Sequence, residues 1–516
     1  MKKVSFLMIF TAIALAFFVS CGGNGKEDDN TDSGDTVTDT GDTEPTDTGD
    51  SEPDGDTEPA DTGDSEPDGD TEPADTGDSE PDGDTEPADT GDSEPDGDAE
   101  PADTGDIEPD DDTGDTGEEG SWEVKYQKAD EHAAEVSGGT VTANNDLGMK
   151  IFSRIAADEA DKNVMISPLS ISIAMAMSTN GASGENLDEM KEALGFGDME
   201  LADVNEQFKH LIASLVAADK DLVLSIADSV WMREDYSLDV KTAFTDVLEE
   251  FYEAEIFTEG FTVENINAWV SEKTNGKIDK IIEEIGEDVV MYLINAIYFK
   301  AAWTTSFSEE NTREEIFTLS DGTETTANFM SFSEEEETPV LLAYSSDSGD
   351  KNGFSMIRIP YGRGVFAFYG IVPTSWNKTK IDDFIAKIAE DGLESYLTLL
   401  HEESDVSLKL PRFKFEYEKS LVDIFKDLGM EKAFEAGGFH NIAELPHDPF
   451  ISNILHKTFI EVNEAGTEAA AVTAVEYSDN AISGGFYANR PFVFVIRDDR
   501  TGSILFIGKV ENPEAE

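Results

Sequence analysis

The chain has 516 residues, of which 114 are acidic and 35 are basic, and its formal net charge at pH 7 is −79. A surface this acidic excludes nucleic acid as a direct partner, because binding to phosphates requires a basic surface. One cysteine is present, which excludes internal disulfide bonds, so the fold must be stabilised by the packing of its core.

The first segment, residues 1–20, has the pattern of an export signal. Two lysines follow Met1, and an almost continuous apolar run extends to Val19. The sequence Phe18-Val-Ser-Cys21 resembles the cleavage box of bacterial lipoprotein signals, in which Cys21 receives the lipid. We therefore expect a membrane partner and a cell-envelope protein exposed on the outer membrane. A plain signal peptide, which gives a secreted protein, is the alternative.

The second segment, residues 21–120, is acidic and repetitive. Residues 22–120 contain 41 acidic residues and one basic residue, and a 14-residue unit that begins at Ser51 occurs four times in succession. Such a composition cannot bury enough apolar surface to offset the chain entropy, so we expect a disordered and self-repelling tether. Alternating acids suit calcium, but no glutamate completes a twelve-residue calcium loop. Loose cation binding remains the alternative.

Residues 121–516 are expected to form one globular domain, which carries 73 acidic and 32 basic residues. About 390 residues are enough for a large core. Apolar spacing predicts helices at 145–157, 170–177, 266–273, 381–400 and 421–428. It predicts strands at 222–232, 289–299, 354–360, 364–373, 406–410, 457–463, 490–496 and 503–510. Helices come mainly first and strands mainly later, which favours an α+β fold.

The segment between the predicted strands at 457–463 and 490–496 is an unusual loop. After the strand at 457–463, small residues alternate as they would in a half-buried strand, with Thr467, Ala469 and Ala471 on one face and Glu468 and Ala470 on the other. A long loop bounded by strands in a compact domain is usually functional. The pattern indicates a strand that is held outside its sheet.

This loop and six further motifs resemble the serpins, a family of protease inhibitors, over residues 126–513. The motifs are Asn163–Ser172, Asn295–Trp303, Leu410–Lys414, His456–Lys457, Asn489–Phe494 and Gly502–Gly508, in the family's order. The resemblance implies an α+β fold with about nine helices around three β-sheets, one of which accepts an additional strand. It also implies an exposed reactive loop near the C-terminus.

The resemblance implies a function by kinetic trapping. A serine or cysteine endopeptidase attacks the loop and forms a covalent acyl complex, and the cut loop then inserts into the central sheet. The partner is the target protease, the inhibitor is a monomer that is not an enzyme, and no cofactor, metal or catalytic residue is needed. The implied hinge residues are Glu464, Gly466, Thr467, Glu468, Ala469, Ala470 and Ala471. Gly466 acts as a pivot, and the small residues slide into the sheet.

Two other groups match the family's apparatus for opening the sheet. Ser167, Ser170, Asn295 and His456 match a buried polar network, whose members must be hydrogen-bonded to one another. Trp303 and Lys300, together with Glu464, match the region where the loop first enters. His456 is thus expected to be a satisfied core histidine rather than a catalytic base.

The reactive bond follows from the family's loop length. A count of fourteen residues forward from Gly466 and a count of eleven residues back from Pro491 both reach Asn480. The predicted bond is therefore Asn480–Ala481. Asparagine does not suit a trypsin-like pocket. It suits an asparagine-preferring cysteine protease or a broad subtilisin-like protease, and a shift of one residue gives Asp479 and an aspartate-specific target.

Two other functions compete with inhibition. The first is a non-inhibitory binding protein or adhesin of the same fold, displayed at the cell surface by the acidic tether. The second is an enzyme, which is disfavoured because the sequence contains no nucleophile elbow, paired carboxylates or metal-ligand motif. The unbroken run of small residues after Gly466 favours the inhibitor.

Overall fold

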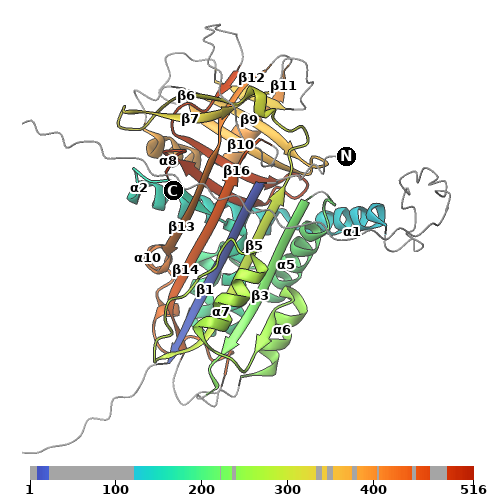
Figure 1. The fold of residues 1–516 in the computed structure, drawn as a ribbon. Coiled ribbons are helices and arrows are strands. Elements are labelled where there is room, and N and C mark those ends of the chain that lie inside the picture. Colours follow the sequence, from blue (N-terminus) through green and yellow to red (C-terminus); the bar gives the residue numbers. More distant parts are fainter. Residues whose placement is uncertain are drawn as a thin grey trace, which may run out of the picture. The chain divides into compact units, whose positions relative to one another are not determined.

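The structure is a computed structural model (Figure 1), and it describes the backbone of residues 9–21 and most of residues 121–515. Within the second range, the description omits residues 221, 235–239, 333–339, 346–352, 375–379, 404–405, 444–448 and 465–484. The predicted tether at 22–120, the hinge residues from Gly466 to Ala471 and the predicted bond Asn480–Ala481 therefore lie outside the described residues.

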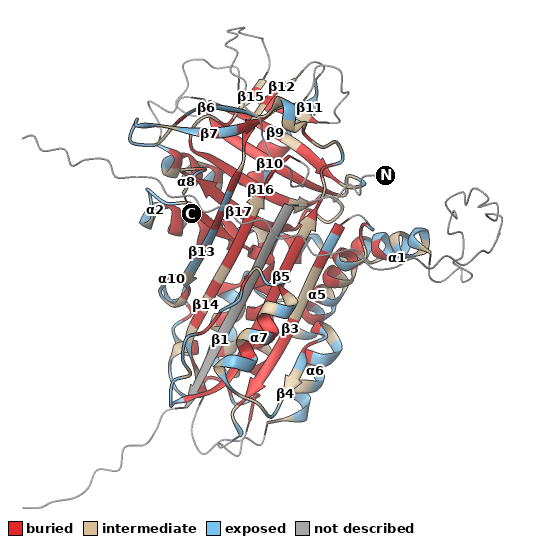
Figure 2. Ribbon diagram, viewed as in Figure 1, coloured by how far each residue is buried: buried red, intermediate tan, exposed pale blue. Residues whose placement is uncertain are grey.

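The domain is built around a six-stranded sheet, in which the strands have the order β13-β14-β1-β5-β3-β4. Its strands are β13 (Phe413–Ser420), β14 (Pro449–Val462), β1 (Ile9–Cys21), β5 (Val289–Ala301), β3 (Leu222–Met232) and β4 (Glu255–Phe257). All of β5 except Lys300 is buried, because both faces of this strand are covered. Figure 2 shows the burial of the sheet strands by colour. The apolar run at 289–299 was predicted to be a central strand, and the structure confirms it.

Strand β1 comes from the predicted export signal. It pairs antiparallel with β14 over Phe10–Cys21 and antiparallel with β5 over Ile9–Ser20. The sequence predicted that this segment lies outside the fold, whereas the structure of the whole chain places it inside the sheet. An apolar segment of 13 residues can satisfy the backbone groups of β5 and β14 that face each other across this position.

Two further sheets complete the β-structure. The seven-stranded sheet has the order β11-β8-β9-β10-β16-β17-β2. Its strands are β11 (His401–Glu402), β8 (Leu341–Tyr344), β9 (Phe354–Tyr361), β10 (Phe366–Pro373), β16 (Phe492–Asp498), β17 (Ile504–Val510) and β2 (Val164–Ile166). The four-stranded sheet, in the order β15-β12-β7-β6, consists of β15 (Gly485–Tyr487), β12 (Ser407–Pro411), β7 (Glu324–Met330) and β6 (Arg313–Thr318).

Ten α-helices occur in the described part of the chain, where the resemblance implied about nine. They are α1 (Trp122–Glu135), α2 (Gly138–Asp158), α3 (Pro168–Gly181), α4 (Glu185–Ala193), α5 (Leu201–Val216), α6 (Thr242–Tyr252), α7 (Val263–Lys273), α8 (Ile381–Asp391), α9 (Leu393–Leu397) and α10 (Val422–Asp427). Two short 3₁₀ helices span Glu309–Asn311 and Lys432–Phe434. The mixed α+β fold with three sheets agrees with the expectation.

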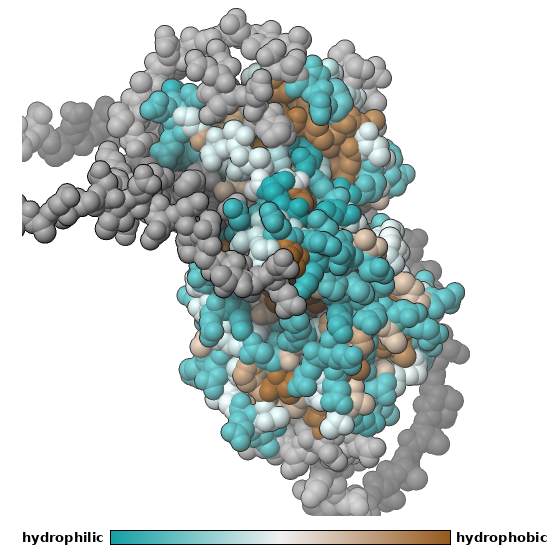
Figure 3. Space-filling model, turned by 90° about the vertical axis from the view of Figure 1, so that its right-hand side faces the viewer, coloured by the Kyte–Doolittle hydropathy of each residue, from teal (hydrophilic) through white to brown (hydrophobic). Residues whose placement is uncertain are grey.

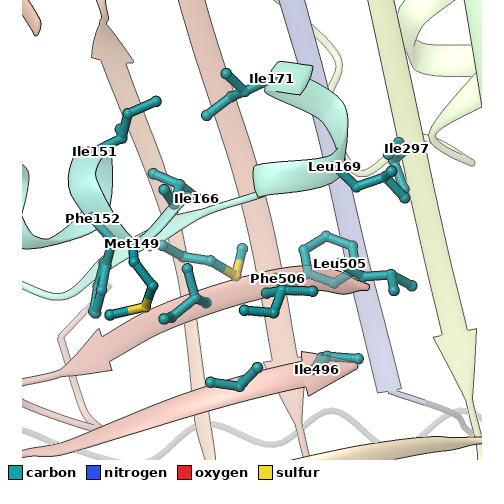
Figure 4. Packing of buried hydrophobic residues seen from close by; sticks show 14 of the residues in the cluster. Met149, Ile151, Phe152, Ile166, Leu169, Ile171, Ile297, Ile496, Leu505 and Phe506 are labelled. Carbon is teal, nitrogen blue, oxygen red and sulfur yellow. The ribbon is translucent and has the colours of Figure 1, made fainter. Parts of the chain in front are cut away.

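Helix α3 lies in the middle of the core. It begins at Pro168, whose ring suits the first helical position, and Ser167 caps it by accepting a hydrogen bond from the backbone N–H of Ser170. Almost every residue of α3 is buried. Figure 4 shows why, since Leu169 packs beside Ile297 of β5 and close to Leu505 of β17, so the helix contributes to packing on both sheets.

A second, smaller core covers the other face of the six-stranded sheet. Here Ile266, Trp269 and Val270 of α7 pack with residues such as Tyr292 of β5 and Trp231 of β3. Successive residues of β3 therefore alternate between the two cores, with Ala227 and Trp231 toward α7 and Val230 toward the main core. This alternation matters for the buried polar residue Asp228, which lies between Ala227 and Ser229.

Two helix predictions were wrong in their limits. The expected helix at 381–400 is interrupted at Gly392, whose φ of 80° lies in the left-handed region and separates α8 from α9. The expected helix at 145–157 begins seven residues earlier, at Gly138, where Ser137 caps it by accepting a hydrogen bond from the backbone N–H of Thr140. Of the helices that the structure describes, none combines the length and apolarity that crossing a membrane requires.

Candidate functional site

The candidate site is the position in the six-stranded sheet between β5 and β14. In the described structure these two strands do not pair with each other, and β1 fills the space between them. Asn295 of β5 and His456 of β14 lie opposite the same residue of β1, Leu15. Any strand that occupies this position therefore separates the two residues.

The predicted polar network is assembled by the fold. The backbone N–H of Ser167 donates a hydrogen bond to Nε2 of His456 at 3.1 Å, and the Oγ of Ser170 donates to Oδ1 of Asn295 at 2.5 Å. All four side chains are fully buried. Helix α3 thus links β14 to β5 through the capping residue Ser167 and its neighbour Ser170.

The imidazole ring of His456 is uncharged in this network and accepts a hydrogen bond. Burial lowers the pKa of His456 to about 3, because the charged imidazolium would be desolvated. Its Nε2 accepts a hydrogen bond, so the proton of the neutral ring is on Nδ1, which has no partner in the described structure. The expectation of a satisfied core histidine is therefore met at Nε2 but not at Nδ1 in the described structure.

Sequence reasoning missed one member of this network, Asp228 of β3. The Nδ2 of Asn295 donates to Oδ1 of Asp228 at 2.9 Å, and the two residues are opposite each other in the β3–β5 ladder. Asp228 is 2% exposed, and burial raises its pKa to about 7. The sequence signal that could have identified Asp228 is that it is the one charged residue in the predicted strand at 222–232.

The end of β14 from which the loop departs is held by a second group of contacts. Nε1 of Trp303 donates a hydrogen bond to the carbonyl oxygen of Asn463 at 2.9 Å, and the Trp303 ring stacks on Tyr361 with the ring centres 4.5 Å apart. The backbone N–H of Phe307 donates to the carbonyl oxygen of Glu464 at 2.8 Å. Trp303 and Glu464 are therefore brought together, as expected.

Glu464 is the last described residue before the loop, and its carboxylate is buried. The Nε of Arg412 donates to both carboxylate oxygens, at 2.6 and 2.7 Å, and Thr312 donates from its hydroxyl group. Arg412 and Thr312 were not predicted as site residues, although Arg412 belongs to the motif Leu410–Lys414. Lys300, which was predicted here, lies near the end of β5 opposite Val223 of β3.

The two described ends of the loop lie in different sheets. The chain leaves β14 of the six-stranded sheet at Glu464 and is described again from Gly485, in strand β15 of the four-stranded sheet. Strand β15 pairs parallel with β12 through Ser407–Lys409. Twenty residues, 465–484, thus connect the two sheets, and they include the predicted hinge and the predicted reactive bond.

Comparison with known proteins identifies the family. The sequence model of the family described as "Serpin (serine protease inhibitor)" matches residues 142–513. The chain belongs to the serpin family. Serpin A3-7 of Bos taurus is 32% identical to this serpin over 383 residues, which are 72% of this chain and 88% of that one. A serpin-like protein of Thermococcus kodakarensis is 31% identical over 72% of this chain and 86% of its own.

Solved structures agree. The native state of tengpin, a thermophilic serpin, is 31% identical and superposes with a TM-score of 0.62 over 72% of this chain and 94% of tengpin. Human thyroxine-binding globulin complexed with its hormone is 25% identical, with a TM-score of 0.62 over 76% of this chain and all of that one. Serpins are in general protease inhibitors rather than enzymes, and a target protease is the partner that the family implies.

The described residues of this serpin contain no group of three or more histidine, cysteine, aspartate or glutamate side chains arranged to hold a metal ion. Helix α1 and the start of α2 precede the matched span. Figure 3 shows that hydrophilic side chains cover most of the described surface on one face, with apolar patches between them, in line with the acidic composition of the domain.

Proposed function

We propose that this serpin is an irreversible, suicide-type inhibitor of an acylating serine or cysteine endopeptidase. The protease cuts the loop that follows Glu464, and the severed loop inserts between β5 and β14. The supporting observation is that this position of the sheet holds an additional strand, β1, which is antiparallel to both neighbours. A loop that follows β14 directly and folds back would have the same orientation as β1.

Insertion of the loop is favoured by the hydrogen bonds that its backbone would form with the two neighbouring strands. Every residue of an inserted strand can donate and accept one ladder hydrogen bond, and successive residues bond alternately to the two neighbouring strands, which is strand addition within one molecule. About fourteen inserted residues at roughly 3.3 Å each would carry a covalently bound protease by about 45 Å. The loop sequence suits this movement, because residues 464–489 contain no proline and the hinge face is made of small residues.

We further propose that the protein is anchored as a bacterial lipoprotein. Residues 1–20 are removed, Cys21 is lipidated, and residues 21–120 hold the serpin domain away from the outer membrane. Removal of residues 1–20 would also take β1 out of the sheet and leave its position to the loop. The apolar run before Cys21 and the acidic repeats support this assignment.

Incubation with a panel of proteases tests the inhibitor proposal. The panel contains an asparagine-preferring cysteine protease, a subtilisin-like protease, an aspartate-specific protease, a chymotrypsin-like protease and trypsin. We expect one of the first two to form a complex that survives denaturing electrophoresis, and mass spectrometry to find a released peptide that begins at Ala481. Trypsin should form none, because no lysine or arginine occurs from residue 458 to residue 489. Cleavage by every active protease without any trapped complex would instead favour a non-inhibitory binding protein.

A further inference from the structure

Two histidines from different helices meet at one side of the domain. Nδ1 of His132, on α1, lies 3.0 Å from Nδ1 of His210, on α5, and the centres of the two rings are 5.2 Å apart. Both residues are half-buried. The pair joins two helices that lie side by side (Figure 1). It is outside the six-stranded sheet, and the proposed inhibition does not use it.

Helix α1 has few buried side chains of its own. Its buried residues are Ala129 and Ala133, whose side chains are single methyl groups, so they contribute little apolar burial. Asp130 pairs with Arg363 and Arg500 at 3.1 Å each, but its side chain is 49% exposed, so solvent screens both pairs. A further link between α1 and α5 would therefore add noticeably to the attachment of this helix.

The separation of the two ring nitrogens fits a shared metal ion. Zinc binds imidazole nitrogen at about 2.0–2.1 Å, so two neighbouring nitrogens of a tetrahedral site are about 3.3 Å apart. In a square-planar site, which copper(II) and nickel(II) prefer, the same bond lengths place neighbouring nitrogens about 2.9 Å apart. The 3.0 Å between the two Nδ1 atoms lies between these values. A hydrogen bond between two neutral rings has the same length and is the competing explanation.

The chemistry of the pair suits a transition metal. Neutral imidazole is a good ligand for zinc, copper and nickel, and either ring nitrogen can bind. Both Nδ1 atoms must offer a lone pair to the metal, so each neutral ring then carries its proton on Nε2. No third histidine, cysteine or carboxylate completes a cluster with the pair among the described residues, so water would fill the remaining positions on the metal. The half-buried rings leave one side of the pair open to water.

We propose that His132 and His210 form a binding site for a divalent transition metal ion, namely copper(II), nickel(II) or zinc, which fastens α1 to α5. Helix α1 begins at Trp122, directly after the predicted tether, and it precedes the span that the serpin model matches. A metal that binds only when both helices are in place stabilises their contact by mass action. The bound ion thus strengthens the joint between the tether and the inhibitor domain, whatever protease the domain traps.

Copper(II) reports directly on the ligands. One equivalent of Cu²⁺ is added to the full-length chain with Cys21→Ser, which removes the only thiol, and pulsed electron paramagnetic resonance counts the bound imidazoles. We expect two imidazoles in this protein and one or none after His132→Gln or His210→Gln. His440→Gln, at an exposed position, is the matched control and should keep two. One imidazole or none in the parent protein would overturn the proposal, even if a variant folds poorly, and so would two in either variant.

Affinity for zinc shows whether the two rings bind one ion together. Calorimetric titration with Zn²⁺ should give a Kd that rises at least about tenfold in either single variant, since the loss of a ligand costs at least as much as the loss of a ligand's partner. The double variant should be no more than about twofold weaker than the single ones, because either substitution already breaks the shared site. The acidic tether is the same in all proteins, so its loose binding of cations cancels. Losses that simply add would mean two separate sites and would overturn the proposal.

Trypsin measures whether the metal fastens α1. Cleavage after Lys125 and Lys128, both in this helix, is followed by mass spectrometry with and without Zn²⁺. At a zinc concentration ten times the Kd, we expect cleavage of the parent protein to slow by about tenfold, because opening that breaks the site is suppressed by this ratio. Cleavage of His210→Gln should not change. An unchanged rate in the parent protein, or equal slowing in His210→Gln, would refute the metal link between α1 and α5.

Discussion

At the scale of single residues, Glu464 determines how the chain leaves β14. Its buried carboxylate accepts two hydrogen bonds from Nε of Arg412 and one from Thr312, so the residue before the loop is fixed. Arg412 is about one-third exposed, so part of the charge attraction is screened by solvent. Glu464 is therefore a firmly held residue at the end of the described part of the chain that precedes the loop.

We predict that Glu464→Gln lowers the free energy of unfolding by about 2–3 kcal/mol, because Arg412 loses its charged partner in a partly buried site. Urea unfolding of the variant and the wild type gives this difference. The matched control is Glu461→Gln in the same strand, whose contact with Lys277 is longer, at 3.8 Å, and partly exposed. It should cost less than about 1 kcal/mol. Equal losses in both variants would contradict the special role of Glu464.

Thr467→Arg should convert the inhibitor into a substrate. Thr467 begins the face of small residues that would be buried on insertion, and an arginine there resists burial. The protease should still cut this variant, but no complex should survive denaturing electrophoresis. Glu468→Arg, on the opposite face, is the matched control and should still trap. Trapping by Thr467→Arg at the wild-type level would exclude insertion of this face.

The sequence predicted most of the residues of the candidate site but not all of their partners. Ser167, Ser170, Asn295 and His456 were found from motifs that are continuous in the sequence, and the fold brings them into one series of contacts. Asp228 and Arg412 were missed because their roles depend on pairing between strands that are distant in the chain. Such pairings leave no local periodicity.

At the scale of elements, the place of β1 in the six-stranded sheet leads to a direct prediction. A chain that retains residues 1–21 has the position between β5 and β14 filled, so the cut loop must displace β1 before it can insert. We expect this chain to trap the target protease more slowly, and to be cut more often without trapping, than a chain that begins at Gly22. The readout is the number of inhibitor molecules consumed per trapped protease.

A proline in β1 provides the control for this comparison. Leu15→Pro removes one ladder donor in the middle of β1 while keeping the full length of the chain. This variant should trap at nearly the rate of the chain that begins at Gly22. Equal trapping by all three proteins would mean that β1 does not compete with the loop.

The anchor is tested by the cysteine. Cys21→Ser removes the only thiol of the chain, and we expect this variant to move from the membrane fraction to the soluble fraction. Fractionation followed by immunoblotting measures the distribution. The acidic tether is unchanged in the variant, so it serves as an internal control. Membrane association that persists after the substitution would reject lipidation as the anchor.

Among the elements, long apolar strands were the easiest to predict. Strand β3 has the predicted limits, and β5 and β17 lie where continuous apolar runs placed them, because strands covered on both faces contain few polar residues. The break at Gly392 and the early start of α2 were missed, since a local cap outweighed the apolar spacing in both places. The insertion of β1 could not be predicted, because it depends on an available position in a distant sheet.

At the scale of the whole molecule, charge is the dominant property. The domain from Ser121 onward has 73 acidic and 32 basic residues, which should attract a basic protease over long distances. We predict that association with a basic target slows by about tenfold when the salt concentration rises from roughly 50 to 300 mM. Stopped-flow fluorescence measures this rate. The rate for an acidic protease should instead increase with salt.

The central claim is that the cut loop becomes a strand of the six-stranded sheet. The most direct test is the thermal unfolding of the chain that begins at Gly22, before and after one cut between Glu464 and Gly485. We expect the melting temperature to rise by roughly 10 °C or more on cleavage, because the inserted loop adds hydrogen bonds along both β5 and β14. A melting temperature that stays the same or falls would show that the loop does not insert.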